Sequence, residues 1–231
     1  MTEERSRRSL LDTGWDVLQI WGVPIGMTGA YMLMMWSSDT DTTGKAWMSI
    51  GLGFVLVVWF VFRMLTLNAA LARAIDVGDA ARILAICERY LGKHRGNAAR
   101  APYLVARAIG HEVLGEWALS LRSLDEAELA VLPAKKRALW QLRASSTRVA
   151  ALLGSGQIPA AREVLERELA PDAKHAPHSD AYLVANLAAG RVLAAEGKAA
   201  EAEARLRRVS DDIRASAAMR AAVAGSLPPS A

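Results

Sequence analysis

The chain has 231 residues, of which 52% are hydrophobic and only 6% aromatic, and its formal net charge is +4. The low aromatic content and the lack of alternating apolar and polar runs exclude an all-β fold and predict an all-α protein. The single cysteine, Cys87, excludes an internal disulfide and a cysteine-based zinc site, and the interspersed charges give no reason to expect a nucleic-acid partner.

Two apolar segments near the N-terminus predict transmembrane helices at about residues 17–36 and 46–64. The first carries no charge and is too long for the apolar region of a signal peptide. The second contains Ala46–Phe62, which is uncharged and bounded by Lys45 and Arg63. Its apolar pattern continues past Arg63, so we expect one unbroken helix there. Residues 1–66 therefore form a tail and a membrane anchor.

Small residues follow one face of the first expected span and recur in the second. Gly22, Gly26 and Ala30 are spaced by four positions, and Gly51 lies in the second span. Small residues let two membrane helices approach closely, so these four positions are candidates for helix contact. The alternative is that glycine is simply frequent in membrane helices.

Basic residues flank the two spans on one side of the expected membrane. Three arginines precede the first span and Arg63, Arg73 and Arg82 follow the second, whereas the intervening turn carries only Lys45. The positive-inside rule then predicts a multi-pass protein of a bacterial inner (plasma) membrane, with both termini cytoplasmic. The lipid bilayer is thus one expected partner, with contact to anionic lipids as an addition.

Residues 67–215 are rich in alanine and repeat a helical pattern. An amphipathic run begins at each of four nearly evenly spaced glycines: Gly78, Gly115, Gly156 and Gly197. A period of roughly 40 residues predicts stacked helix pairs joined at the glycines. The first helices of the pairs are expected at 67–77, 101–114, 135–153 and 180–196. Residues 216–231 are expected to form a flexible tail.

The pattern resembles tetratricopeptide (TPR) repeats. Ala161 and Ala202 lie five positions after their turn glycines, where that family has alanine, and Gly190 lies seven before Gly197. Large apolar residues occupy the matching positions Leu124, Leu165 and Leu206, with a small residue at Ala127. The period is longer than the family's, and Ile83 and Ser120 replace the alanine. The resemblance implies an α-solenoid of about four helix pairs that binds other proteins through a concave face lined by the first helices.

Motifs for chemistry are missing from the sequence. There is no phosphate-binding glycine loop, metalloprotease motif or nucleophile elbow, so we expect no enzymatic activity and no cofactor. His175 and His178 could share a metal, but without a nearby carboxylate pair we interpret them as loop residues. We expect Cys87 to be a buried apolar residue.

Polar and aromatic side chains on the expected first helices are the candidates for partner binding. They are Tyr103, Arg107, Trp140, Arg143, Asn186 and Arg191. Basic clusters at 93–100, 135–137 and 205–208 could meet an acidic partner or lipid, or could be solvated surface.

Together these features favour a membrane-anchored scaffold that recruits or organises another protein at the cytoplasmic face of the membrane. The alternative is an accessory or assembly subunit of an integral membrane complex, held through its two transmembrane helices. An enzyme with an unrecognised site is the third hypothesis.

Overall fold

The computed structural model describes residues 26, 29, 31, 42–93, 96–169 and 179–226. These residues form helices and no strand, which confirms the predicted all-α class. The chain divides into two compact units, Met1–Asn68 and Ala69–Ala231. The first expected span, 17–36, lies almost entirely outside the described residues, as do His175 and His178.

Helix α2 is a single helix from Thr42 to Val77, so the expected continuation past Arg63 is confirmed. Large apolar side chains project from its first-unit part: Phe54 is 70% exposed and Phe62 66%, and Ile50, Val57 and Val58 are also exposed. Within the part of the chain that the structure describes, no helix is both long and apolar enough to cross a membrane.

The glycines expected in the contact between the two spans show no close packing. A Cβ added to Gly26 or to Gly51 would meet no described atom within 4 Å. Gly22 and Ala30, the other two positions of that prediction, lie outside the described residues.

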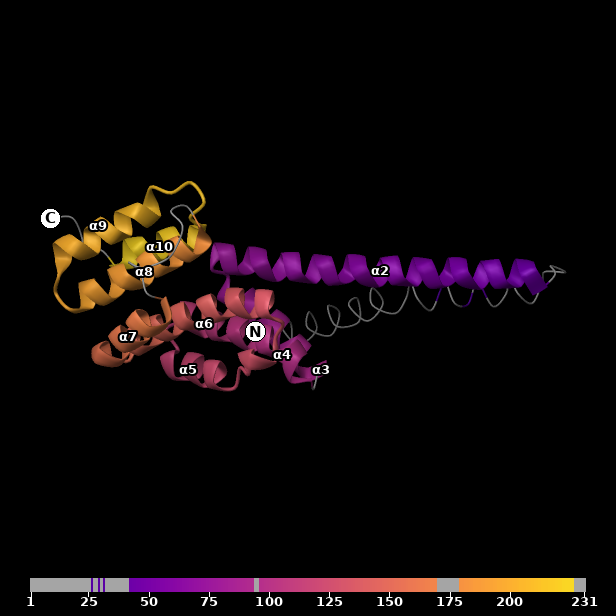
Figure 1. The fold of residues 1–231 in the computed structure, drawn as a ribbon, viewed down its shortest axis with the longest axis horizontal. Helices are drawn as coiled ribbons and strands as arrows, with labels where there is room; N and C mark the ends of the chain where they lie inside the picture. The colour runs from indigo at the N-terminus through magenta and orange to yellow at the C-terminus, as the bar shows by residue number, and fades with distance from the viewer. Residues whose placement is uncertain are drawn as a thin grey trace, which may run out of the picture. The chain divides into compact units, whose positions relative to one another are not determined.

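The second unit is built from the end of α2 and the helices that follow it (Figure 1). Their bounds are α3 Ala80–Lys93, α4 Asn97–Val113, α5 Trp117–Asp125, η1 Leu129–Val131, α6 Ala134–Gly154, α7 Ile158–Val164, the π-helical η2 Leu165–Leu169, α8 Asp180–Ala195, α9 Ala199–Ser210 and α10 Ala217–Ser226. The four expected first helices correspond to the end of α2, α4, α6 and α8.

Each predicted glycine turn is present and has the same geometry. Gly78, Gly115, Gly156 and Gly197 have φ angles of 77°, 73°, 75° and 79°, the left-handed region that glycine enters without steric cost. After each glycine the next backbone N–H donates to the carbonyl five positions earlier, over 2.8 to 2.9 Å. This hydrogen bond satisfies an end carbonyl of the preceding helix, and the next helix begins at once.

The second helices bury equivalent positions. Five positions after each turn glycine lie Ile83, Ser120, Ala161 and Ala202, all at most 2% exposed. Ser120 is tolerated there because its hydroxyl donates to the Ala108 carbonyl at 2.9 Å. Nine positions after the glycines lie Cys87, Leu124, Leu165 and Leu206, all buried. Cys87 thus takes the place of a core leucine, as a buried apolar residue.

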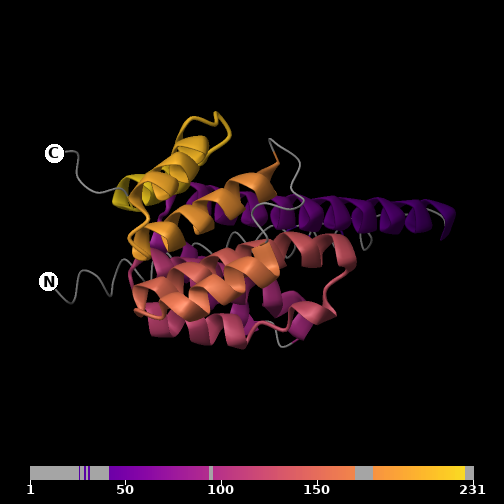
Figure 2. The ribbon, with the colours of Figure 1, turned by 60° about the vertical axis from the view of Figure 1, so that its left-hand side comes forward.

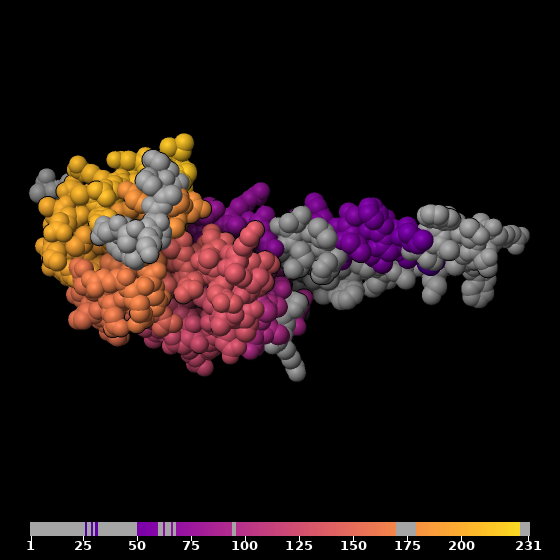
Figure 3. Space-filling view, viewed as in Figure 1, coloured from indigo at the N-terminus to yellow at the C-terminus, as the bar shows by residue number. Residues whose placement is uncertain are grey.

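The helices of the second unit pack in sequence order. Helix α3 packs on α4, α4 on α5, and α6 contacts α4, α5, α7 and α8, so the first helices α4, α6 and α8 are neighbours (Figures 1 and 2). Gly190 of α8 allows α9 to approach, because a Cβ there would lie 2.7 Å from the Leu206 side chain. On the face seen in Figure 3, atoms of α6, α7 and α9 belong to one continuous surface.

Two expected boundaries differ from the structure. Helix α4 begins at Asn97 rather than 101, because Ala98 and Ala99 are strong helix formers. Part of the expected tail is helical: α10 packs Val223 against the core that α8 and α9 form around Leu206. Burial of that apolar side chain explains why alanine-rich residues 217–226 are ordered rather than a tail.

Candidate functional site

A cavity of about 740 Å³ lies within the second unit. Its walls come from the last turn of α2, the C-terminal half of α4, the inner faces of α6 and α8, and α10. This volume falls in the range of about 300–1,000 Å³ that is usual for ligand sites.

Helices α6 and α8 line the cavity with the same repeat positions. In α6 these positions hold Leu139, Leu142, Arg143 and Ser146, and in α8 they hold Asp180, Leu183, Val184 and Leu187. The two sets coincide when each is counted back from its own turn glycine, Gly156 for α6 and Gly197 for α8. Steps of three and four positions place each set on one helix face. The cavity is therefore the inner face of a repeated structure.

Much of the lining is aliphatic, and part of it is exposed. Val77 of α2, Val113 of α4 and Leu139 of α6 line the cavity and are 68%, 47% and 47% exposed. Three helices thus present large apolar side chains to the cavity. Exposed apolar groups gathered in this way are typical of binding surfaces.

Charged side chains of both signs also line the cavity. Arg191 of α8 pairs with Glu112 of α4 at 2.9 Å, and both side chains are mostly buried. Arg214 pairs with Asp212 at 2.8 Å, and these hydrogen bonds raise the pKa of Arg214. The Arg143 guanidinium lies 5.6 Å from the centre of the Trp140 ring, within reach of a cation–π interaction.

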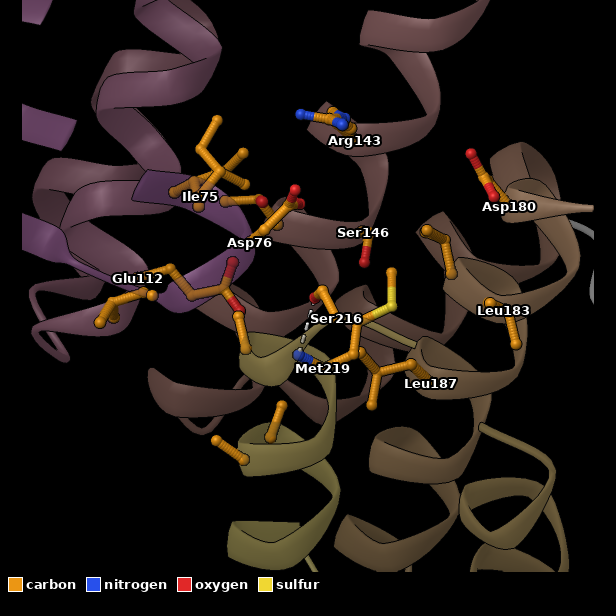
Figure 4. A pocket seen from close by; sticks show the side chains of 18 of the residues that line it. Ile75, Asp76, Glu112, Arg143, Ser146, Asp180, Leu183, Leu187, Ser216 and Met219 are labelled. Carbon is orange, nitrogen blue, oxygen red and sulfur yellow. Dashed lines mark hydrogen bonds between the residues drawn. The ribbon is translucent and has the colours of Figure 1, made fainter. Parts of the chain in front are cut away.

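Figure 4 shows how the lining residues converge from different helices. Ile75 and Asp76 come from α2, Arg143 and Ser146 from α6, and Asp180, Leu183 and Leu187 from α8. Met219 of α10 lies beside Leu187, in the same apolar cluster. The Ser216 hydroxyl accepts a hydrogen bond from the Met219 N–H at 3.2 Å and so begins α10 beside the cavity.

The structure brings two of the predicted partner-binding residues, Arg143 and Arg191, into the cavity. A third, Trp140, packs against core residues of α4, and the Arg143 guanidinium lies over its ring.

The other three predicted residues contact neighbouring helices instead of the cavity. The Tyr103 ring stacks on Tyr90 with 3.6 Å between centroids, and burial raises the pKa of Tyr103 to about 12. Arg107 donates to Ser123 and pairs with Glu126 at 2.8 Å. All three lie outside the cavity because their repeat positions differ from those of the lining residues: Tyr103 faces α3, Arg107 faces α5 and Asn186 faces α9.

Asn186 illustrates why a polar residue on a first helix need not be a binding residue. It is fully buried, its amide donates to the Tyr182 carbonyl at 2.8 Å, and its oxygen accepts from Arg205 at 3.1 Å. Both polar ends of the amide are thereby satisfied within the fold.

Several basic residues of the expected clusters have partners inside the chain. Arg137 donates to the carbonyls of Ala130 and Leu132, which explains a cation in the first turn of α6. Arg207 pairs with Glu203 at 2.5 Å. A second hollow of about 370 Å³ between α7, α8 and α9 is lined by Arg162 and Arg208 among others, and Arg162 pairs with Glu196.

Sequence reasoning missed most of the cavity lining, including the aliphatic residues and Asp76. The usable signal was the repeat register: counting back from each turn glycine identifies the inner face of α6 and α8 together. Within the described ranges no group of histidine, cysteine and carboxylate side chains could hold a metal ion.

Comparison with known proteins gives no match to this chain among protein-family models, curated proteins or solved structures.

Proposed function

We propose that the chain is an interaction scaffold that holds a segment of another protein in the cavity of its second unit. The observation that carries this proposal is the set of exposed aliphatic side chains, Val77, Val113 and Leu139, which open on one cavity from three helices. The resemblance of the glycine-marked helix pairs to TPR repeats supports the same function, since TPR arrays bind proteins on this face.

The size of the cavity favours a peptide segment. About 740 Å³ accommodates several side chains of an extended or helical segment, and apolar walls with a few polar groups provide both affinity and orientation. A segment of this kind binds by inserting apolar anchors into the groove.

Photocrosslinking in the cells that make the protein tests this proposal. A photoreactive phenylalanine analogue replaces Leu139 or Val113 in the full-length chain. Leu119 and Val131 are matched controls, because they are equally apolar and 46% and 45% exposed but do not line the cavity. We expect a defined protein adduct from the two cavity positions and none of that mass from the two controls.

Two results of the crosslinking contradict the proposal. One is an adduct of the same protein from Leu119 and Val131, which places the contact elsewhere. The other is the absence of adducts from all four positions in cells where the chain is folded and expressed.

We further propose that the first unit attaches the scaffold to a bacterial inner membrane through α2, with the second unit in the cytoplasm. The support is the uncharged run Ala46–Phe62 together with the exposed side chains of Phe54 and Phe62, which water solvates poorly. Lys135, Lys136 and Arg208 are the basic residues that could add contacts to anionic head groups.

Alkaline extraction of membranes tests the attachment. The wild-type chain should stay in the membrane pellet. Val57→Arg places a charge in the apolar run, at a cost of about 3 kcal/mol in a bilayer, and should shift protein to the soluble fraction. Val131→Arg, at an exposed site in the second unit, is the control and should leave the protein in the membrane pellet. Full extraction of the wild-type chain by alkali contradicts the attachment.

A further inference from the structure

Two of the three carboxylates that line the cavity, Asp76 and Asp180, have no ion-pair partner among the described residues. Of the three arginines that line the cavity, Arg191 and Arg214 are paired with Glu112 and Asp212. Arg143 lies over the Trp140 ring, which attracts its guanidinium without neutralising the charge. Among the carboxylates, Asp76 and Asp180 have no hydrogen bond or ion pair in the described part of the chain, although Asp180 adds a minor attraction to Arg214.

Asp76 has the less favourable position of the two carboxylates. It lies in the last turn of α2, which contains no basic residue, so the carbonyl ends of the helix repel its charge. Asp76 is exposed, and no cation within the described ranges pairs with it. Asp76 therefore presents its carboxylate at the cavity without an ion pair among the described residues.

Asp76 and Asp180 flank aliphatic lining. Figure 4 draws Asp76 on α2 and Asp180 on α8, with Leu183 and Leu187 on α8 below Asp180. Val77, the last residue of α2, and Leu139 of α6 are exposed and line the same cavity. A ligand that fills this space meets aliphatic side chains and two carboxylates at once.

We propose that the cavity selects protein segments that carry a lysine or arginine close to aliphatic side chains. This inference rests on the proposed function and specifies its partner. A cation placed at Asp76 forms a charge-assisted hydrogen bond and removes the repulsion from the helix end. The net charge of +4 does not prevent this, because at physiological salt charges more than about 8 Å away are screened.

A random dodecamer peptide display library, selected on the purified full-length chain, is the probe. We expect the selected peptides to be enriched in Lys or Arg next to Leu, Ile or Val. On the double variant Asp76→Asn, Asp180→Asn the basic enrichment should disappear. Glu201→Gln is the matched control, an exposed carboxylate on α9 outside this cavity, and should leave the enrichment unchanged.

One selected peptide then provides the quantitative test. Replacing its basic residue by Gln should weaken binding to the wild-type chain about tenfold and binding to the double variant less than twofold. Raising the salt concentration should weaken binding to the wild-type chain only. Thermal unfolding checks the fold, and Asp76→Asn should unfold at the same or a slightly higher temperature, because it relieves the repulsion at the end of α2.

The outcomes separate this inference from the proposed function. Selection of neutral or acidic apolar peptides, with binding that is lost in Leu139→Ser, would overturn the preference for basic segments. The proposed scaffold function would still hold in that case. If the basic enrichment disappears on Glu201→Gln as completely as on the double variant, the preference for basic segments is overturned too. If no selected peptide depends on Leu139, both the inference and the proposed function fail.

Discussion

The two units use large apolar side chains in opposite ways. In the first unit, Phe54 and Phe62 of α2 are 70% and 66% exposed. In the second unit, Ile83 and Leu206 are fully buried between helices of the array. Where the second unit exposes large apolar residues, as at Val113 and Leu139, several of them open on a single cavity.

This contrast separates apolar side chains that stabilise the array by burial from apolar side chains that the described part of the chain leaves exposed. The array buries leucines against alanines, and about 25 cal/mol per Å² of apolar surface removed from water contributes to its folding. The exposed part of α2 gains nothing of this kind within the described residues. This exposed apolar surface is the basis of the proposed membrane attachment, and the exposed lining of the cavity is the basis of the proposed partner binding.

The largest expected effect comes from removing a core leucine. Leu206→Ala leaves a hole between α8, α9 and α10, and should lower the free energy of unfolding of the second unit by about 3 kcal/mol. Phe54→Ala removes a larger side chain from the exposed face of α2 and should change that free energy by less than about 0.5 kcal/mol. Guanidinium denaturation followed by circular dichroism measures both.

Equal effects of the two substitutions would remove the contrast between the units. A further variant sharpens it: Gly190→Ala places a Cβ 2.7 Å from Leu206 and should destabilise the array. In the Leu206→Ala background the clash is absent, so the added cost of Gly190→Ala should largely disappear.

The next effect concerns the turns. Gly156→Ala should cost about 1.5 kcal/mol, because φ is 75° and no neighbouring atom lies within 4 Å of the new Cβ, so the cost is one of backbone conformation. Gly92→Ala, in the last turn of α3 with open space around it, should be neutral or slightly stabilising. A stabilising Gly156→Ala would show that the turn does not require a left-handed residue.

The sequence predicted the array well because its signals are local. A glycine that ends a helix and an apolar pattern with the period of the α-helix depend on neighbours in the chain, so the four turns and the helices around them were found. Helix α10 was missed because its order depends on Val223 meeting α8 and α9, a contact that local propensity does not encode.

The candidate site was predicted only in part for a similar reason. Arg143 and Arg191 line the cavity, but Arg107 and Asn186 were chosen for their polarity and instead bond to their own helix pair. Which face of a first helix is inner depends on how successive pairs stack. The cavity lining also contains leucines and valines, which in a sequence resemble any core residue.

A smaller effect is expected from the pair Glu112–Arg191, which joins α4 to α8 across the cavity. In a double-mutant cycle with Glu112→Gln and Arg191→Met, we expect a coupling energy of about 1 kcal/mol, since both side chains are mostly shielded from water. The control cycle uses Arg167 and Glu163, an exposed pair in α7 and η2, and should give less than half as much. Additive effects at Glu112 and Arg191 would mean that the pair does not hold the cavity walls together.

The last effect is a loss of stability at high pH. Burial raises the pKa of Cys87 to about 12 and that of Tyr103 to about 12, above their ordinary values of 9.0 and 10.0. Between those values the folded state keeps protons that the unfolded state releases, so the unfolded state gains stability as pH rises. The free energy of unfolding should change little between about pH 6 and 8.5 and fall between about pH 9 and 12.

Thiol labelling examines the same burial at a single atom. A thiol reagent should modify Cys87 only as fast as the second unit opens, because the side chain is fully buried and its thiolate is disfavoured. In the variant Leu139→Cys, the added thiol lies on an exposed cavity position and should react without unfolding. Similar rates for the two thiols would place Cys87 outside the core. If Leu139→Cys is labelled faster than Cys87 and a bound peptide slows that labelling, Cys87 belongs to the folded core and Leu139 to the surface that a partner covers.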